Sequence, residues 1–266
     1  MLKILCPTDF SANAEYAAEY GVHLANALNA GLVLIASYKV PVVTGALRSL
    51  DEKIQEALTD DLRYFAGKYK PLVTTGIEPE TVVVQGNTSV SILDYARKSG
   101  IDLIVMGTKG SSSMANVFMG SITRKFFQSS TIPVLAIPFA SRQSFDGNRI
   151  LLALDSHGIG NQHSIALLRE MKKTPGVSVD VIHVSKNGEK IKFNANTGML
   201  AGIVDEIIEI PGSDPVMEIK HFVDNNNVGI LAMVGRKHSF LERLFFETHS
   251  VSELFVSNIP VLLLPD

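Results

Sequence analysis

The chain has 266 residues, of which 46% are apolar and 19% charged, and its formal net charge is −3. This composition excludes a disordered chain and supplies enough apolar residues for a sizeable core. A small negative charge gives no attraction to nucleic acid or to an anionic membrane, so neither is expected as a partner. The length allows one large domain or two of ordinary size.

The N-terminal residues and the cysteine content predict a cytoplasmic protein. The opening MLKILCPTDF lacks the basic segment and long apolar run of a signal peptide. No apolar run reaches the roughly 18 residues of a membrane span. Cys6 is the only cysteine, and its place in an apolar run favours a small buried side chain over a nucleophile. The histidines show no ligand spacing such as HExxH, so no metal site is predicted.

Continuous apolar runs alternate with helical patterns in the first half of the chain. The runs lie at residues 2–6, 32–37, 81–85, 103–106 and 134–137. Unbroken apolar runs are typical of parallel strands that are covered on both faces. Apolar residues recur at helical spacing between these runs, at residues 14–28, 47–69, 90–96 and 120–129. This alternation predicts a doubly wound α/β domain with a five-stranded parallel, Rossmann-like sheet.

Three segments of the first half recur in the second half in the same order. They are KILCPTDFS (3–11) with RILLALDSH (149–157), DLIVMGTKGS (102–111) with GILAMVGRKHS (229–239), and IPVLAIP (132–138) with IPVLLLP (259–265). Three repeated segments in the same order indicate an internal duplication, in which each copy is a domain. We therefore expect two tandem α/β domains, residues 1–140 and 148–266, joined by a polar seam rich in turn formers.

A glycine-rich loop follows the fourth predicted strand. The segment GTKGSSSMANVFMGS, residues 107–121, places Gly107, Gly110 and Gly120 before a predicted helix. Glycine lets the backbone approach a ligand closely, and successive N–H groups form a concave anion site. The helix that starts at Gly120 and Ser121 adds unpaired N–H groups, the positive end of its dipole and a hydroxyl donor. The loop therefore predicts a site for the phosphates of an adenine nucleotide.

Pro7, Thr8 and Asp9 follow the first predicted strand, as the glycine loop follows the fourth. Open α/β sheets bind ligands beyond the carboxyl ends of strands, where the strand order reverses, so neighbouring first and fourth strands would share one crevice. Asp9 is either a ligand contact or a cap of the helix that follows. Lys109 either reaches phosphate or is a solvated loop side chain, and Gly107 taken alone is equally a turn glycine.

These segments together resemble the universal stress protein family. The resemblance rests on CPTDFS, the segment from Gly86 to Ile92, DLIVMGTKG with the later GSIT, and PVLAIP, and it covers both copies. It implies a tandem member with the adenine nucleotide alpha hydrolase-like fold. In the ATP-binding branch of that family the glycine motif holds the phosphates and ribose, while residues after the first two strands meet the adenosine.

The resemblance implies roles for individual residues of the first copy. The phosphates would be held by Gly107, Gly110, Gly120 and Ser121, with further contacts from Lys109, Ile122 and Thr123. The adenosine would lie against Pro7, Thr8 and Asp9, beside Met106, with the main chain of Ser37 meeting the base. The bound ligand would be ATP, ADP or AMP, with or without Mg²⁺.

The second copy departs from the motif where the phosphates would lie. Gly235 matches Gly107, but side chains occupy the remaining motif positions, namely His238, Glu247, Thr248 and His249. A glutamate repels phosphate at short range, and a side chain blocks close approach of the backbone. The nucleotide is therefore expected in the first domain only.

The predicted function is a regulatory, stress-response protein that binds an adenine nucleotide and hydrolyses it weakly at most. The chain has no P-loop or GxGxxG motif, and no Glu, His or second Asp stands near the glycine loop to activate water. We therefore expect no enzyme in the ordinary sense. Two alternatives remain open: an interaction scaffold that works without nucleotide, and a slow ATP-hydrolysing enzyme.

The two PVLxxP strands, residues 134–137 and 261–264, are predicted partners of each other. An exposed sheet edge invites pairing, and two similar short apolar strands can satisfy one another. Members of the family that this chain resembles dimerise through the last strand. The two halves would then form a pseudo-dimer within one chain, and association of two chains into a homodimer stays open.

Overall fold

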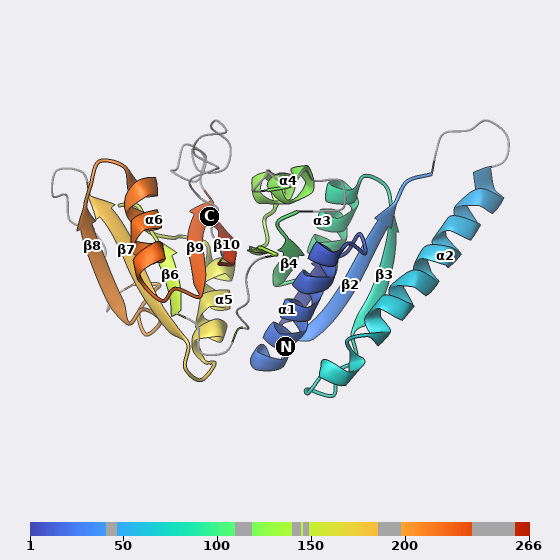
Figure 1. Cartoon of the computed structure of the whole chain (residues 1–266), viewed down its shortest axis with the longest axis horizontal. Helices are drawn as coiled ribbons and strands as arrows, with labels where there is room; N and C mark the ends of the chain where they lie inside the picture. Colours follow the sequence, from blue (N-terminus) through green and yellow to red (C-terminus); the bar gives the residue numbers. More distant parts are fainter. Residues whose placement is uncertain (41–46, 110–118, 140–144, 146–148, 186–197, 236–258) are drawn as a thin grey trace. The chain divides into compact units, whose positions relative to one another are not determined.

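The computed structural model describes the chain apart from residues 41–46, 110–118, 140–144, 146–148, 186–197 and 236–258 (Figure 1). The chain divides into two compact units, Met1–Ile132 and Pro133–Asp266. Strands alternate with helices through the first unit, as the apolar pattern of the first half of the chain predicts. None of the described helices combines the length and apolar character needed to cross a bilayer.

The described residues of the first unit form four strands and four α-helices. In chain order they are β1 (Lys3–Pro7), α1 (Ala12–Leu28), β2 (Gly31–Tyr38), α2 (Leu47–Gly67), the 3-10 turn η1 (Lys70–Leu72), β3 (Glu80–Gln85), α3 (Thr88–Lys98), β4 (Leu103–Gly107) and α4 (Ser121–Ser129). Parallel pairing gives the order β3-β2-β1-β4. The chain builds outward from β1 to β3 and then returns to β4 on the other side of β1. The predicted neighbourhood of the first and fourth strands is thus confirmed, and the strand order reverses between them.

The described residues of the second unit form six strands and two α-helices. Its elements are β5 (Val134–Ile137), β6 (Arg149–Ala153), α5 (Gln162–Lys172), β7 (Ser178–Ser185), β8 (Glu206–Pro211), α6 (Pro215–Asn225), β9 (Ile230–Gly235) and β10 (Val261–Pro265). The described strands follow the order β5-β10-β9-β6-β7-β8. All described pairs are parallel except β5 with β10, in which Leu135 lies opposite Leu262. The α/β class and the pairing of the two PVLxxP strands are confirmed.

The strand β5 ends the first sequence repeat but is grouped by its contacts with the second unit. The predicted domain boundary at residues 140–148 comes after this strand, and most of that seam lies outside the described residues. The domain limits 1–140 and 148–266 therefore stay predictions. Both β5 and β10 are buried along their whole length, so each short strand requires a neighbour on its edge.

Small residues let α1 lie close to the strands of the first unit. Ala14, Ala17 and Ala18 are buried on its inner face, and strand β4 is buried at every position. Gly21 approaches most closely, because a Cβ atom added there would lie 2.5 Å from Cys6 Sγ. This contact requires glycine at position 21 for as long as sulfur fills position 6.

We expect Gly21→Ala to lower the free energy of unfolding by about 1–2 kcal/mol, since overpacking outweighs the gain in helix propensity. Cys6→Ala removes the sulfur that the new methyl group would strike. The double variant should therefore be more stable than the sum of the two single changes predicts, by about 1 kcal/mol or more. Urea unfolding of all four chains checks this, and strict additivity would show that the helix has room for the methyl group.

Candidate functional site

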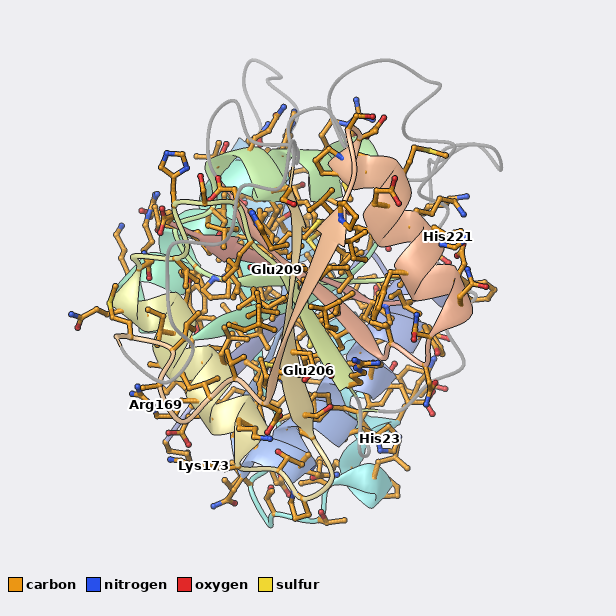
Figure 2. The ribbon with its side chains drawn as sticks, turned by 90° about the vertical axis from the view of Figure 1, so that its left-hand side faces the viewer. His23, Arg169, Lys173, Glu206, Glu209 and His221 are labelled. Carbon is orange, nitrogen blue, oxygen red and sulfur yellow. The ribbon has the colours of Figure 1, made fainter. Side chains whose placement is uncertain are left out.

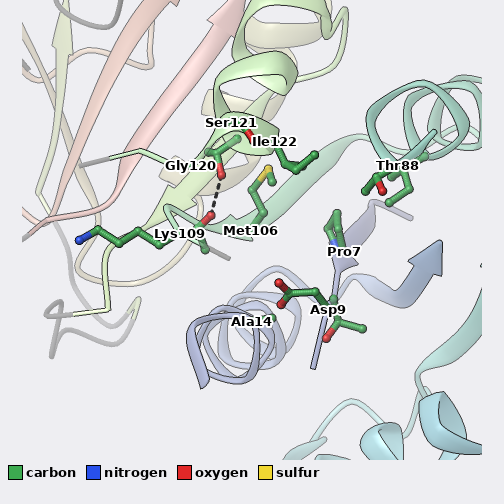
Figure 3. Close-up of a pocket in the computed structure, with 13 residues that line it drawn as sticks. Pro7, Asp9, Ala14, Thr88, Met106, Lys109, Gly120, Ser121 and Ile122 are labelled. Atoms are coloured by element: carbon green, nitrogen blue, oxygen red, sulfur yellow. Dashed lines mark hydrogen bonds between the residues drawn. The ribbon is translucent and has the colours of Figure 1, made fainter. Parts of the chain in front are cut away.

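A pocket of about 250 Å³ lies at the carboxyl ends of β1 and β4, where the strand order reverses (Figure 3). All of its described lining residues belong to the first unit. They are Pro7, Thr8, Asp9, Ala14, Thr88, Ile92, Met106, Gly107, Lys109, Gly120, Ser121, Ile122 and Thr123. The position agrees with the rule that open α/β sheets bind ligands at a topological switch point.

One wall is the turn from β1 into α1. Thr8 is buried and its N–H donates to the carbonyl of Ile35 on β2 (2.9 Å), which continues the sheet by one residue. Asp9 is exposed and accepts hydrogen bonds from the N–H (3.1 Å) and the hydroxyl (2.5 Å) of Ser11. Ser11, in turn, is the N-cap of α1 and accepts from the N–H of Ala14. Asp9 therefore orients the capping residue without being the cap, and its carboxylate also borders the pocket.

The opposite wall is the N-terminus of α4. Its N-cap is Gly120, which has an extended backbone and makes no side-chain cap bond, so no side chain of the described residues caps Ser121 and Ile122. The first helical hydrogen bond is donated by the N–H of Arg124 to the carbonyl of Gly120 (3.0 Å). The N–H groups of Ser121, Ile122 and Thr123 therefore have no partner within the helix. Together with the positive end of the helix dipole, they lie at the pocket.

Loop carbonyls that would repel an anion are held by donors of the same wall. The N–H of Gly120 donates to the carbonyl of Thr108 (2.7 Å). The hydroxyl of Thr123 donates to the carbonyl of Gly107 (2.9 Å), the bond drawn in Figure 3. Among the described groups of this wall, these carbonyls are hydrogen-bonded, and the first N–H groups of α4 supply the positive partial charge. Thr123 is buried, and its hydroxyl is committed to the loop.

Gly107 allows the two walls of the pocket to lie close together. A Cβ atom added there would lie 3.0 Å from the carbonyl oxygen of Asn13 and 3.3 Å from that of Lys109. Backbone atoms cannot give way as the end of a flexible side chain can. Gly107 therefore lets the first turn of α1 lie against the end of β4, which is a packing role in addition to the predicted ligand contact.

The predicted contact residues converge with two exceptions. Ser37 does not line the pocket, and Gly110 lies outside the described residues. Lys109 lines it, but its side chain extends away from Pro7 and Asp9 in Figure 3. Each assigned ligand contact stays a prediction, because proximity to a pocket does not by itself demonstrate binding.

The third side of the pocket comes from α3, a helix that was not among the predicted contact residues. Thr88 and Ile92 of this helix line the pocket, and the hydroxyl of Ser37 donates to that of Thr88 (2.9 Å). Asn87 at the N-cap of α3 makes no side-chain cap bond. The available signal was Asn-Thr-Ser directly after a predicted strand, a pattern typical of a helix start at the carboxyl edge of a sheet.

The described lining residues combine an apolar surface with anion-attracting N–H groups. Pro7, Ile92 and Met106 supply apolar surface, and α4 supplies the positive helix end. Asp9 is the one carboxylate among the described lining residues. Burial raises the pKa of the Cys6 thiol far above its usual value, so this thiol stays protonated and is no nucleophile. The arrangement suits binding of a ligand with an apolar part and an anionic part.

Comparison with known proteins places this architecture in one family. The sequence model of the universal stress protein family matches residues 1–138. Universal stress protein YxiE of Bacillus subtilis is 29% identical over 144 residues, covering 51% of this chain and 97% of that protein. Universal stress protein MJ0531 of Methanocaldococcus jannaschii is 28% identical over 137 residues, covering 51% of this chain and 81% of that protein.

A universal stress protein structure from Archaeoglobus fulgidus covers 99% of this chain and 96% of its own, at 18% identity and a TM-score of 0.68. This similarity shows that the α/β fold extends over both units. The family match covers more than half of the chain and includes the whole described pocket. The chain therefore belongs to the universal stress protein family.

Proposed function

We propose that this protein binds one adenine nucleotide, ATP foremost, in the pocket of the first unit and acts as a nucleotide-dependent regulator of the stress response. The observation that carries the proposal is the N-terminus of α4, which no described side chain caps, beside a pocket with an apolar side. A phosphate chain would accept hydrogen bonds from the first N–H groups of this helix, and a base and ribose would cover the apolar residues.

Equivalent positions of the second unit are identified by equivalent hydrogen bonds. The N–H of Gly86 donates to the last residue of β2 (2.8 Å), and the N–H of Gly212 donates to the last residue of β7 (3.1 Å). Thr88, two residues after the first glycine, thus corresponds to Asp214. A carboxylate stands in the second unit where the first unit has a hydroxyl.

Acidic side chains accept hydrogen bonds at the start of one helix of the second unit and just before another. Asp214 is the N-cap of α6 and accepts from the N–H of Val216 (3.0 Å), while Pro215 begins the helix without an N–H. Before α5, Asp266 accepts from the N–H groups of Gly160 (2.6 Å) and the next residue (3.2 Å). Internal carboxylates therefore take N–H groups that could otherwise hold an anion, and they repel phosphate.

The occupation of these N–H groups by carboxylates supports binding of a nucleotide in the first unit only, as the degenerate glycine motif predicts. The motif positions of the second copy after Gly235, including His238 and Glu247, lie outside the described residues. Their effect on binding stays a prediction from sequence. The carboxylates of Asp214 at the N-cap of α6 and of Asp266 just before α5 are an independent reason for the same proposal.

Hydrolysis is proposed to be weak at most. Among the described lining residues, only Asp9 could act as a base, and its carboxylate already accepts two hydrogen bonds from Ser11. Positioning of a phosphate chain without a base or an arginine finger gives little rate enhancement. Such a site would regulate by switching the protein between a nucleotide-bound and a nucleotide-free state.

Calorimetric titration of the purified full chain with ATP is expected to give one site per chain. Titrations with ADP, AMP and cAMP under the same conditions would rank the ligands. A stoichiometry of two nucleotides per chain would contradict the proposal that the second unit binds none. No heat of binding, together with no nucleotide released from heat-denatured protein, would contradict the proposed function and favour a nucleotide-independent scaffold.

A further inference from the structure

Two hydroxyl groups from distant parts of the sequence meet at the pocket. Ser37 on β2 and Thr88 on α3 are 51 residues apart, and the hydroxyl of Ser37 donates to that of Thr88 (2.9 Å). Both side chains are partly buried, and Thr88 is the member of the pair that lines the pocket. Because Thr88 accepts from Ser37, its own O–H remains available as a donor.

The surroundings of Thr88 differ from those of the α4 N-terminus. In Figure 3, Thr88 lies on the side of Pro7, whereas Gly120 and Ser121 lie across the pocket beyond Met106. Ile92, one turn along α3 from Thr88, is fully buried and adds apolar surface on this side. An apolar wall that carries a neutral hydroxyl donor suits a nucleoside, while the N-terminus of α4 suits its phosphates.

We propose that Thr88 donates a hydrogen bond to an acceptor atom of the nucleoside, and that Ser37 is the residue that positions it. This inference rests on the proposed function, because it concerns the same pocket and the same ligand. It also gives Ser37 a different role from the one implied by family resemblance. The resemblance implies that the main chain of Ser37 contacts the base, whereas here its hydroxyl positions Thr88.

The strands make Ser37 a rigid support for Thr88. Ser37 lies near the end of β2, opposite Val84 of β3, and β2 is hydrogen-bonded on both edges by β1 and β3. Thr88 is the first residue of α3, so its side chain leaves a helix start that directly follows β3. A hydroxyl that is anchored in this way loses less rotamer entropy on binding a ligand than a free side chain does.

Affinities of the full chain for ATP, AMP and adenosine test the inference, with adenosine measured by competition against labelled ATP. Thr88→Val keeps the shape of the side chain and removes its hydroxyl. It is expected to weaken the binding of all three ligands by the same factor, about fivefold, which corresponds to the loss of one neutral hydrogen bond. Thr88→Ser should restore most of the affinity.

The positioning role of Ser37 is tested by a double-mutant cycle. Ser37→Ala is expected to weaken ATP binding by about threefold in the wild-type background and to have no effect when Thr88 is valine. Ser37→Thr, which keeps the hydroxyl, should bind as the wild type does. Comparison of 2′-deoxy-ATP and 3′-deoxy-ATP with ATP in wild type and Thr88→Val then shows whether a ribose hydroxyl or a base atom is the acceptor.

Each of the other outcomes would overturn the inference. Unchanged affinity of Thr88→Val shows that the hydroxyl meets no ligand atom. A loss for ATP with none for adenosine places Thr88 at the phosphates, and equal effects of Ser37→Ala in both backgrounds show that Ser37 does not act through Thr88. If the wild type binds none of the three ligands, the proposed function itself fails, and this inference fails with it.

Discussion

Replacing Ser121 with proline is expected to weaken ATP binding by roughly 100-fold or more. The substitution deletes one N–H group and one hydroxyl from the N-terminus of α4. Each is proposed to bond a charged phosphate oxygen, and such bonds contribute about 1.5–3 kcal/mol apiece. The loss should appear in the dissociation constant for ATP, measured by calorimetry on the full chain.

The backbone at this position accepts proline. Ser121 is the first residue of α4, where the N–H has no partner within the helix and proline is favoured. Gly120 already has the extended conformation (φ −65°, ψ 158°) that a residue before proline adopts. The protein itself shows the arrangement at Pro215, which begins α6. The helix is therefore expected to survive the change.

Ser121→Ala is the matched control, because it removes the hydroxyl and keeps the N–H. It should weaken ATP binding by about tenfold, well short of the proline variant. The circular dichroism spectrum and the melting temperature without ligand should stay close to wild type in both variants. A folded Ser121→Pro protein with wild-type affinity for ATP would refute the proposal that the α4 N-terminus holds phosphate.

Gly107→Ala is expected to lower the free energy of unfolding by about 1–3 kcal/mol. Its methyl group would be 3.0 Å from the carbonyl oxygen of Asn13, so the first turn of α1 must move away from the end of β4. That movement separates the wall bearing Asp9 from the wall formed by α4. Urea unfolding measures the loss of stability, and ATP titration should show weaker binding as well.

Gly31→Ala is the control for the Gly107 variant. A Cβ atom at Gly31 would meet its nearest neighbour, the Cε of Met1, at 3.7 Å, an ordinary van der Waals contact. The same chemical change should therefore alter stability by no more than about 0.5 kcal/mol. Equal stability of the two variants would mean that Gly107 is only a turn glycine and that α1 does not require it.

The sequence predicted elements and motifs that are written in consecutive residues. Unbroken apolar runs marked the strands, because a parallel strand buried on both faces has no polar positions. The glycine loop and the helix start at Ser121 were recognisable because glycine and capping residues have strong local preferences. The duplication was visible for the same reason, since each repeat carries its own copy of these local signals.

Contacts between distant residues could not be read in this way. Ser37 reaches Thr88 across 51 residues, and Asp266 reaches Gly160 across 106, so no local pattern indicates either pair. The prediction placed Ser37 at the base and omitted α3 from the pocket, because hydrophobic periodicity locates a helix without stating what its first turn faces.

The sequence by itself determined the α/β class, the duplicated architecture, the family and a glycine loop suited to anions, all of which depend on local preference and residue spacing. The tertiary structure alone decided that Gly107 makes room for Asn13, that Thr88 borders the pocket and that the carboxylate of Asp266 accepts hydrogen bonds just before α5. The physical reason is that these features depend on the packing of elements against one another, which is settled only when the sheet brings the strand ends together.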